Sequence, residues 1–319
     1  MLILLWGLEN DPPLAAVREQ LQSLGAPIVF ADQRDVQDIG IDLEVSQNVS
    51  ASLRIRGESF DLAGVTAAYL RPYNSCDLAD IASAGPDSAA WKHAALADDI
   101  LASWIEISPA FLVNPFPAMA ANSSKPYQLE QIRRQGWSVP ETLVTTDPEA
   151  AHAFWEKHGD VIYKSVSGIR SQVSRLRPEH RRRFADIGSC PTQFQRCIRG
   201  RDHRVHVVGC EVFACDVRCD ADDYRYPGDS AVEMRACVLP RDIQDRCRET
   251  AQAASLPFAG IDLRRTSEGE WFCFELNPSP GFTYYESQTG QPIAKSVARL
   301  LMQGSLAAIP REAELSAYA

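Results

Sequence analysis

The first hundred residues alternate short apolar runs with a segment whose apolar residues recur at helical spacing. Leu2–Trp6 is an apolar run that stops at Gly7, and Pro27–Phe30 is a second one. Between them, four apolar residues fall on one face of a helix that ends before Gly25: Leu14, Val17, Leu21 and Leu24. A strand, a helix and a second strand in this order predict an α/β lobe.

Further elements fill the chain up to residue 113. Ser52–Ile55 and Ser59–Leu62 flank Gly57 and predict a hairpin, and Val65–Leu70 predicts another strand. Ser88–Ile107 is long and alanine-rich, which is typical of a helix. The sequence Asn-Pro-Phe-Pro at residues 114–117 then interrupts the pattern. We therefore expect a first α/β domain over residues 1–113.

Two more units are expected after this break. Residues 114–191 predict two helices and two strands: Lys125–Gln135, Thr142–Thr145, Pro148–His158 and Val161–Val166. Residues 192–305 predict five strands and two helices: Phe194–Ile198, Arg204–Val208, Val212–Val217, Arg241–Ala254, Ile261–Arg264, Trp271–Leu276 and Ile293–Met302. Residues 306–319 are expected to form a tail. The fold class is therefore mixed α/β (α+β).

Composition narrows the functional classes. The 319 residues carry a formal net charge of −10, which argues against nonspecific nucleic-acid binding because that requires a basic surface. No apolar run is long enough to cross a membrane, and the N-terminus resembles a first strand more than a signal peptide. The 9 cysteines contain no CxxC pair and are expected to be reduced. A cytoplasmic protein without a membrane or nucleic-acid partner is expected.

Three oxygen ligands gather near a Pro/Gly-rich turn towards the C-terminus. Glu275 and Asn277 are two residues apart in a strand candidate, which points both side chains to one face. Asp262 lies in an apolar segment that is a candidate for the neighbouring strand. Carboxylate and amide oxygens without imidazoles or thiolates favour Mg²⁺ over Zn²⁺. Because Mg²⁺ completes such a shell with water and phosphate, this pattern indicates ATP chemistry.

Two lysines are candidates for phosphate binding. Lys164 lies in a strand candidate and precedes a segment of small residues whose N–H groups can approach phosphate closely. Lys125 follows Asn-Ser-Ser, which can cap a helix, and a helix N-terminus attracts phosphate. Taken alone, each lysine is also compatible with a solvated position. No GxxxxGK[ST] motif exists, which excludes a P-loop.

The third unit contains three arginines that are candidates for binding an anion: Arg204, Arg218 and Arg225. Their guanidinium groups match phosphate or carboxylate, although each alone fits a surface position equally well. Whether the first two share a face depends on the register around Gly209. No specific Ser/His/Asp set and no GxSxG elbow are present.

The order of these residues resembles that of the ATP-grasp superfamily over roughly residues 111–303. Three local strings are similar to those of its branch of ribosomal-protein glutamate ligases and microviridin-type (graspetide) peptide macrocyclases. The first is Asn114-Pro115 followed by Asn122–Leu129 and Pro140–Thr142. The second is Asp223–Arg225, and the third is Glu275–Pro278 followed by Thr289–Ile293. The resemblance implies an N-terminal pre-ATP-grasp lobe, a central lid lobe and a C-terminal catalytic lobe.

The resemblance also implies roles for individual residues. Phosphate contacts would come from Lys125 and Lys164, with a closing loop at Ser167 and Gly168. The remaining nucleotide contacts would come from the hinge and from a ribose-binding carboxylate: Gln195, Arg196, Cys197, Ile198 and Asp202. Mg²⁺ or Mn²⁺ would be held by Asp262, Glu275 and Asn277. The γ-phosphate and the acceptor carboxylate would be handled by Arg204, Arg218 and Arg225.

Two departures from the family pattern concern the hinge and the substrate side. Arg196 stands where the family has an acidic residue, and residues 279–285 lack the polar stretch typical of the macrocyclases. The implied reaction is ATP-dependent joining of a carboxylate to an amine or hydroxyl through an acyl phosphate. The expected partners are ATP, a peptide or amino acid bearing a carboxylate, and a second copy in a homodimer. A phosphotransferase and a non-catalytic nucleotide-binding regulator are the alternatives. The first lobe is expected to recognise the acceptor, with Arg71 as a candidate.

Overall fold

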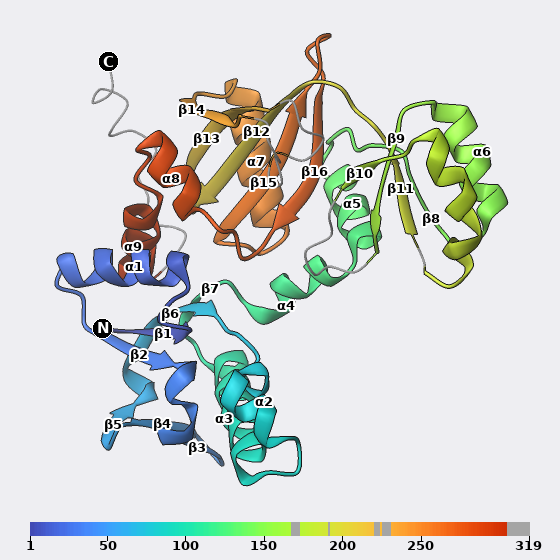
Figure 1. Ribbon diagram of the computed structural model, residues 1–319. Coiled ribbons are helices and arrows are strands. Elements are labelled where there is room, and N and C mark those ends of the chain that lie inside the picture. The colour runs from blue at the N-terminus through green and yellow to red at the C-terminus, as the bar shows by residue number, and fades with distance from the viewer. Residues whose placement is uncertain (167–172, 191, 220–223, 225–230, 305–319) are drawn as a thin grey trace.

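The computed structural model describes residues 1–166, 173–190, 192–219, 224 and 231–304. The chain forms three lobes in sequence order, drawn from blue through green and yellow to red in Figure 1. Each lobe is built on its own sheet, and helices cover the sheet faces. No helix in the described part of the chain combines the length and the apolarity needed to cross a membrane.

The first lobe contains a parallel sheet in the order β2-β1-β6-β7. Its strands are β1 (Leu2–Gly7), β2 (Ile28–Asp32), β6 (Val65–Arg71) and β7 (Phe111–Val113). The helices are α1 (Pro12–Ser23), α2 (Ala79–Ala84) and α3 (Ala89–Ile107). Asp11 caps the first of them by accepting a hydrogen bond from the Leu14 N–H, and Pro12 follows at the first helical position. The expected α/β opening is confirmed.

A small antiparallel sheet extends this lobe: β3 (Ile39–Val45), β4 (Val49–Ile55) and β5 (Glu58–Asp61). The predicted hairpin across Gly57 is confirmed by the pairing of β4 with β5. Strand β3 was missed by the sequence analysis, although its apolar residues alternate with Gly40, Asp42 and Glu44 in the pattern of a half-buried strand. Its apolar residues nevertheless pack on the core beneath the main sheet.

The middle lobe contains a four-stranded sheet in the order β10-β9-β11-β8. Its strands are β8 (Thr142–Thr145), β9 (Val161–Ser165), β10 (Ser174–Arg175) and β11 (Thr192–Arg196), and α6 (Pro148–His158) packs on it. The strand predicted over Phe194–Ile198 therefore begins and ends two residues earlier. The middle sheet also includes residues 192–196, which the sequence assigned to the third unit.

The C-terminal lobe contains an antiparallel sheet in the order β14-β13-β12-β15-β16. Its strands are β12 (Arg201–Val208), β13 (Glu211–Arg218), β14 (Glu233–Cys237), β15 (Phe258–Arg265) and β16 (Trp271–Asn277). The helices are α7 (Arg241–Ala253), α8 (Thr283–Thr289) and α9 (Ile293–Gln303). A short helix α4 (Phe116–Met119) and α5 (Lys125–Arg134) precede the middle sheet, and α5 packs on β16. The predicted hairpin across Gly209 is confirmed.

One core joins the first and last lobes. Helix α9 packs against α1, as Figure 1 shows, and apolar residues of both helices are buried together with Phe258 and Phe282. A second core lies on the opposite face of the C-terminal sheet, between its strands and α7. The middle lobe has a separate core under α6. The C-terminal sheet is therefore fixed to the first lobe, while the middle sheet is packed independently.

Candidate active site

A cavity of about 310 Å³ lies between the middle sheet and the C-terminal sheet. Its walls include residues from β9, β10, β11, β12, β15 and β16, and from the segment that links the two sheets. Seven of the predicted site residues line it: Lys164, Gln195, Cys197, Ile198, Asp202, Asp262 and Glu275. Residues separated by more than a hundred positions thus reach one cavity.

A row of charged residues crosses three strands of the C-terminal sheet beside this cavity. Arg204 on β12 is directly opposite Asp262 on β15, which is directly opposite Glu275 on β16. The predicted neighbouring strand for Asp262 is thereby confirmed. Side chains at such opposed positions have Cβ atoms about 4.5–5.5 Å apart, and two like charges there destabilise the sheet. Two opposed carboxylates therefore suit a divalent cation held between them.

Asn277 extends the ligand set along the same strand. It pairs with Gly260, two residues beyond the Asp262–Glu275 pair and on the same face. Its Oδ1 accepts a hydrogen bond from the Ser279 N–H (2.9 Å), which fixes the carboxamide at the turn. A bulge at Phe274 re-aims the strand, so that Phe274 and Glu275 both line the cavity.

The donor chemistry of these three residues fits Mg²⁺. Two carboxylates and one amide supply hard oxygens and leave positions for water and phosphate. Among the described residues, no group of three or more His, Cys, Asp or Glu side chains gathers into a metal site. A thiolate- or imidazole-rich zinc site is therefore not present in that part of the chain.

Arg204 is almost fully buried, with 5% of its surface exposed. Its Nη1 donates to Asp262 Oδ1 (2.7 Å), and its guanidinium lies 5.5 Å from the centre of the Tyr285 ring. Burial lowers the pKa of Arg204, but the Asp262 carboxylate and nearby tyrosines raise it more, so the net shift is upward. Arg204 is consequently a fixed positive charge beside the candidate metal ligands.

Asp202 is engaged by an arginine that the sequence did not single out. Arg264 donates from Nε to Oδ1 (2.6 Å) and from Nη2 to Oδ2 (2.8 Å) of Asp202. Its third donor, Nη1, binds the Ile198 carbonyl (2.7 Å). This bidentate ion pair fixes the Asp202 carboxylate, the proposed ribose ligand, and the third bond connects Arg264 to the linking segment. Side chains alternate along β15, so Arg264 lies on the same face as Asp262. This two-residue spacing is visible in the sequence and could have identified Arg264 as a site residue.

The middle sheet contributes one polar face. Lys164 pairs with Gln193, and Ile162 pairs with Gln195, so these four residues share a side of the sheet. Gln195 Nε2 donates to Thr142 Oγ1 (3.0 Å). The opposite side faces the core under α6. Strand alternation thus brings Lys164 to the cavity, a position that the sequence left open.

The linking segment begins where β11 ends. Arg196 is exposed, and its N–H donates to the Glu141 carbonyl (2.9 Å). The Cys197 N–H donates to the Asp160 carbonyl (2.9 Å), and Ile198 is buried. The N–H of Cys197 and the carbonyl of Ile198 are therefore already bound within the protein.

Other predicted residues do not line this cavity. Lys125 is half-buried at the start of α5. Arg218 lies on the opposite face of the sheet from Arg204, because Arg204 pairs with Cys215. Its guanidinium is half exposed and lies 3.6 Å from Asp216 and 4.0 Å from Glu233. The expectation that Arg204 and Arg218 act together is therefore not supported by the register.

Ser167, Gly168 and Arg225 lie outside the described residues. Their neighbour Tyr224 is described and lines the cavity. Its hydroxyl is 3.1 Å from the hydroxyl of Tyr285. Burial raises the pKa of both phenols, so the pair remains protonated and hydrogen-bonded beside Arg204.

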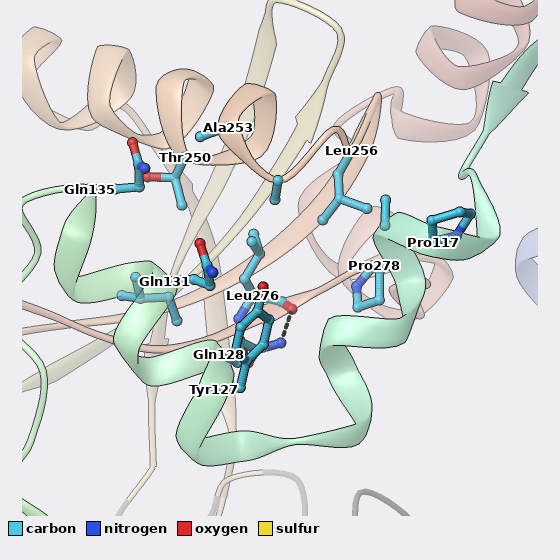
Figure 2. Close-up of a pocket in the computed structure, with 13 residues that line it drawn as sticks. Pro117, Tyr127, Gln128, Gln131, Gln135, Thr250, Ala253, Leu256, Leu276 and Pro278 are labelled. Carbon is cyan, nitrogen blue, oxygen red and sulfur yellow. Dashed lines mark hydrogen bonds between the residues drawn. The ribbon is translucent and has the colours of Figure 1, made fainter.

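Two buried amide side chains, Gln128 and Asn114, lie behind the candidate metal ligands, and the sequence assigned neither of them a role. Gln128 on α5 donates to the Leu276 carbonyl (2.7 Å) and accepts from the Leu276 N–H (3.1 Å), and Figure 2 shows its side chain pointing at this strand. Leu276 lies between Glu275 and Asn277, so this pair of bonds fixes the backbone that carries both ligands.

Asn114 has the same function at the next turn. Its Nδ2 donates to the Phe258 carbonyl (2.6 Å) and to the Pro278 carbonyl, and its Oδ1 accepts from the Phe258 N–H (3.1 Å). Arg71 holds the turn from the first lobe, since its Nη1 donates to Ser279 Oγ (2.8 Å) while its Nε binds Asp11. Arg71 is therefore bound at the turn after Asn277.

Comparison with known proteins is consistent with this geometry. Residues 122–301 of the 319 match the family model described as the RimK-like ATP-grasp domain. No match was found among curated proteins. Solved structures that share the fold include macrocyclase MdnC bound with precursor peptide MdnA from Microcystis aeruginosa MRC, at 20% identity and a TM-score of 0.81, covering 95% of this chain and 100% of that one.

Two further structures are similar over most of the chain. ATP-grasp ligase PsnB complexed with minimal precursor, Mg and ADP is 27% identical with a TM-score of 0.79, covering 95% of this chain and 96% of that one. A Chryseobacterium gregarium RiPP-associated ATP-grasp ligase in complex with ADP and a leader and core peptide is 21% identical with a TM-score of 0.80, covering 95% and 97%.

Proposed function

This chain belongs to the RimK-like ATP-grasp family, and we propose that it is an ATP-dependent ligase that joins a carboxylate to an amine or hydroxyl on a peptide. The observation that carries the proposal is the row Arg204–Asp262–Glu275, which lies beside the cavity that Lys164 lines from the facing sheet. The peptide substrate class is supported by PsnB, whose structure contains a minimal precursor.

The cavity suits a nucleotide with its phosphates towards the metal ligands. We assign adenine recognition to backbone groups of Cys197 and Ile198, because both residues line the cavity in the segment that links the two sheets. Lys164 would contact the phosphates, and the fixed carboxylate of Asp202 would accept from the ribose hydroxyls. Ser167 and Gly168 keep their proposed place in the closing loop.

The chemistry needs charge neutralisation and positioning more than a protein nucleophile. The substrate carboxylate attacks the γ-phosphoryl group of ATP, giving an acyl phosphate and ADP, and an amine or hydroxyl then displaces phosphate. Arg204 supplies a permanent positive charge where the carboxylate and the γ-phosphate meet. Asp262, Glu275 and Asn277 would hold Mg²⁺ or Mn²⁺, which neutralises phosphate charge when bound. Arg225 remains a candidate for the acceptor carboxylate.

Location and assembly form part of the proposal. All 9 cysteines lie within the described residues and none forms a disulfide there, which suits a reducing, cytoplasmic compartment. We also propose a homodimer as the working assembly, to be tested by light scattering at micromolar concentration.

The first test is mass spectrometry of reactions with Mg-ATP, alongside phosphate release. The panel contains acidic peptides, including any encoded beside the gene, and free amino acids. We expect the mass of the peptide to fall by one water for each new bond that forms within it, and we expect phosphate to be released at the same time. A stable phosphorylated product would instead establish a phosphotransferase, and Mg-ATP binding without ADP release would indicate a regulator.

A further inference from the structure

A histidine lies directly behind the buried arginine of the site. His206 is 1% exposed and follows Arg204 by two residues on β12, so both side chains are on the same face of the sheet. The Nε of Arg204 donates to Nε2 of His206 (3.4 Å). The imidazole also packs edge-on against Tyr285, with ring centres 5.2 Å apart.

The bond from Arg204 determines the protonation of this ring. A nitrogen that accepts a hydrogen bond carries no proton, so the neutral ring holds its proton on Nδ1. Burial lowers the pKa of His206 well below its usual value, and the Arg204 charge lowers it further, while a hydrogen bond to the Gly281 backbone opposes both. The neutral ring thus links Arg204 to the turn that follows Asn277.

The other sides of the guanidinium are also occupied. A Cβ atom at Gly260 would collide with Nη2 of Arg204 and lie 2.7 Å from the Pro280 side chain, so the guanidinium passes over this glycine. Asp262 binds Nη1, and the Tyr285 ring faces the guanidinium carbon. His206 is the partner of Nε, the donor that sets the rotation of the guanidinium plane about the side chain.

We infer that His206 is a positioning residue for the reaction, which acts by holding the guanidinium of Arg204 through its Nε. Without this acceptor, Nε is left buried and unsatisfied, and the guanidinium can rotate away from the geometry that serves Asp262 and the transferring phosphoryl group. The inference rests on the proposed function for the role of Arg204, but the placement of Arg204 can be tested without it.

The decisive comparison uses two replacements of similar length. His206→Gln keeps a polar acceptor at the end of the side chain, whereas His206→Met fills similar space without one. We expect His206→Met to lower kcat about 10- to 100-fold, the range seen when groups supporting a site are removed. His206→Gln should stay within about 5-fold of the parent. Equal losses in the two variants would show that His206 only fills space and would overturn the inference.

A second readout does not require any substrate. In protein labelled with ¹⁵N-arginine, the Nε–H signal that disappears in Arg204→Lys identifies Arg204. This signal should be protected from exchange in the parent and in His206→Gln, and exchange at least 10-fold faster in His206→Met. Retained protection in His206→Met would refute the inference even if no peptide is ever modified, and thus separates its failure from failure of the proposed function.

A double-mutant cycle completes the test. Lysine at position 204 lacks Nε, so adding His206→Met to Arg204→Lys should cost no further activity if His206 acts through Arg204. A multiplicative loss in the double variant would show an independent role and contradict the inference. Thermal unfolding of all variants checks that they fold.

Discussion

The C-terminal sheet and the middle sheet face the same cavity, yet their polar side chains are held in different ways. On the C-terminal sheet, Arg204 binds Asp262 at 2.7 Å and Arg264 binds Asp202 through two bonds. On the middle sheet, Gln193 is fully buried, and neither atom of its amide has a hydrogen-bond partner in the part of the chain that the structure describes.

This difference is confined to one side chain of the middle sheet, because Gln195 on the same face is bonded to Thr142 while Gln193 is buried without a partner among the described residues. Buried polar groups are costly unless they are paired, so the paired side chains of the C-terminal sheet are stable in one arrangement. Gln193 shares a face with Lys164, and its unpaired amide destabilises the protein by itself. We expect substitutions on the C-terminal sheet to impair chemistry, and those on the middle sheet to alter nucleotide affinity.

The largest effect is expected at the proposed metal ligands. Glu275→Gln should reduce turnover at least about 1000-fold, because a neutral amide cannot neutralise the cation and the phosphate charge it supports. The fold should remain, as judged by circular dichroism and thermal unfolding. Glu270→Gln is the matched control, since Glu270 is exposed and its carboxylate accepts a hydrogen bond from Ser138 Oγ (2.7 Å) outside the cavity. Near-normal ADP release by a folded Glu275→Gln variant would remove this metal assignment.

A smaller effect is expected at the amide behind the ligands. Gln128→Ala would leave the Leu276 N–H and carbonyl buried without partners, which should lower the free energy of unfolding by about 2–4 kcal/mol. Gln131→Ala is the control, because Gln131 lies one turn further along α5 and lines, together with Gln128, a small pocket between α5 and α7 (Figure 2). The measurement is urea unfolding of both variants. Equal losses of unfolding free energy in the two variants would show that the stability depends on the surface of α5 and not on the bonds from Gln128 to the Leu276 backbone.

For the middle sheet, we expect a substitution to change the affinity for ATP. Lys164→Ala should weaken ATP binding about 10- to 100-fold in calorimetry, since a hydrogen bond from a charged group contributes about 1.5–3 kcal/mol. Lys157→Ala is a suitable control, as Lys157 is exposed on α6 and lies 3.6 Å from Glu141. Unchanged affinity for ATP in Lys164→Ala would contradict its role at the phosphates and weaken the comparison between the two sheets.

The smallest effect tests the unpaired amide directly. Gln193→Met has a similar size but no unsatisfied polar atoms, so the ligand-free protein should gain about 1 kcal/mol in stability. A loss of stability in the ligand-free variant would show that the amide is satisfied in solution and would break the comparison.

Much of this site was predictable because it depends on local periodicity. Glu275 and Asn277 share a face since side chains alternate along a strand, and the apolar segment around Asp262 indicated the neighbouring strand, which the register confirms. Lys164 reaches the cavity for the same reason. The boundaries of β11 and the opposite facing of Arg218 depended on register and strand ends, which composition does not specify.

The supporting residues were not predictable, because their partners lie far away in the chain. Gln128 binds Leu276 across 148 residues, and Asn114 binds Phe258 across 144. A glutamine on a helix or an asparagine before a proline is ordinary in sequence, and only packing makes either one buried. His206 likewise becomes informative only when Arg204 and the turn at Gly281 lie on either side of it.

The sequence by itself determined the α/β class, most strands and helices, and the residue types that suit magnesium and phosphate, because these follow from alternation, helical spacing and donor chemistry. Tertiary structure decided which charged residues meet. It placed Arg204, Asp262 and Glu275 in one row, turned Arg218 to the other face, and buried the amides that hold the ligand strand. Register and long-range packing depend on contacts between distant segments, and no local pattern contains that information.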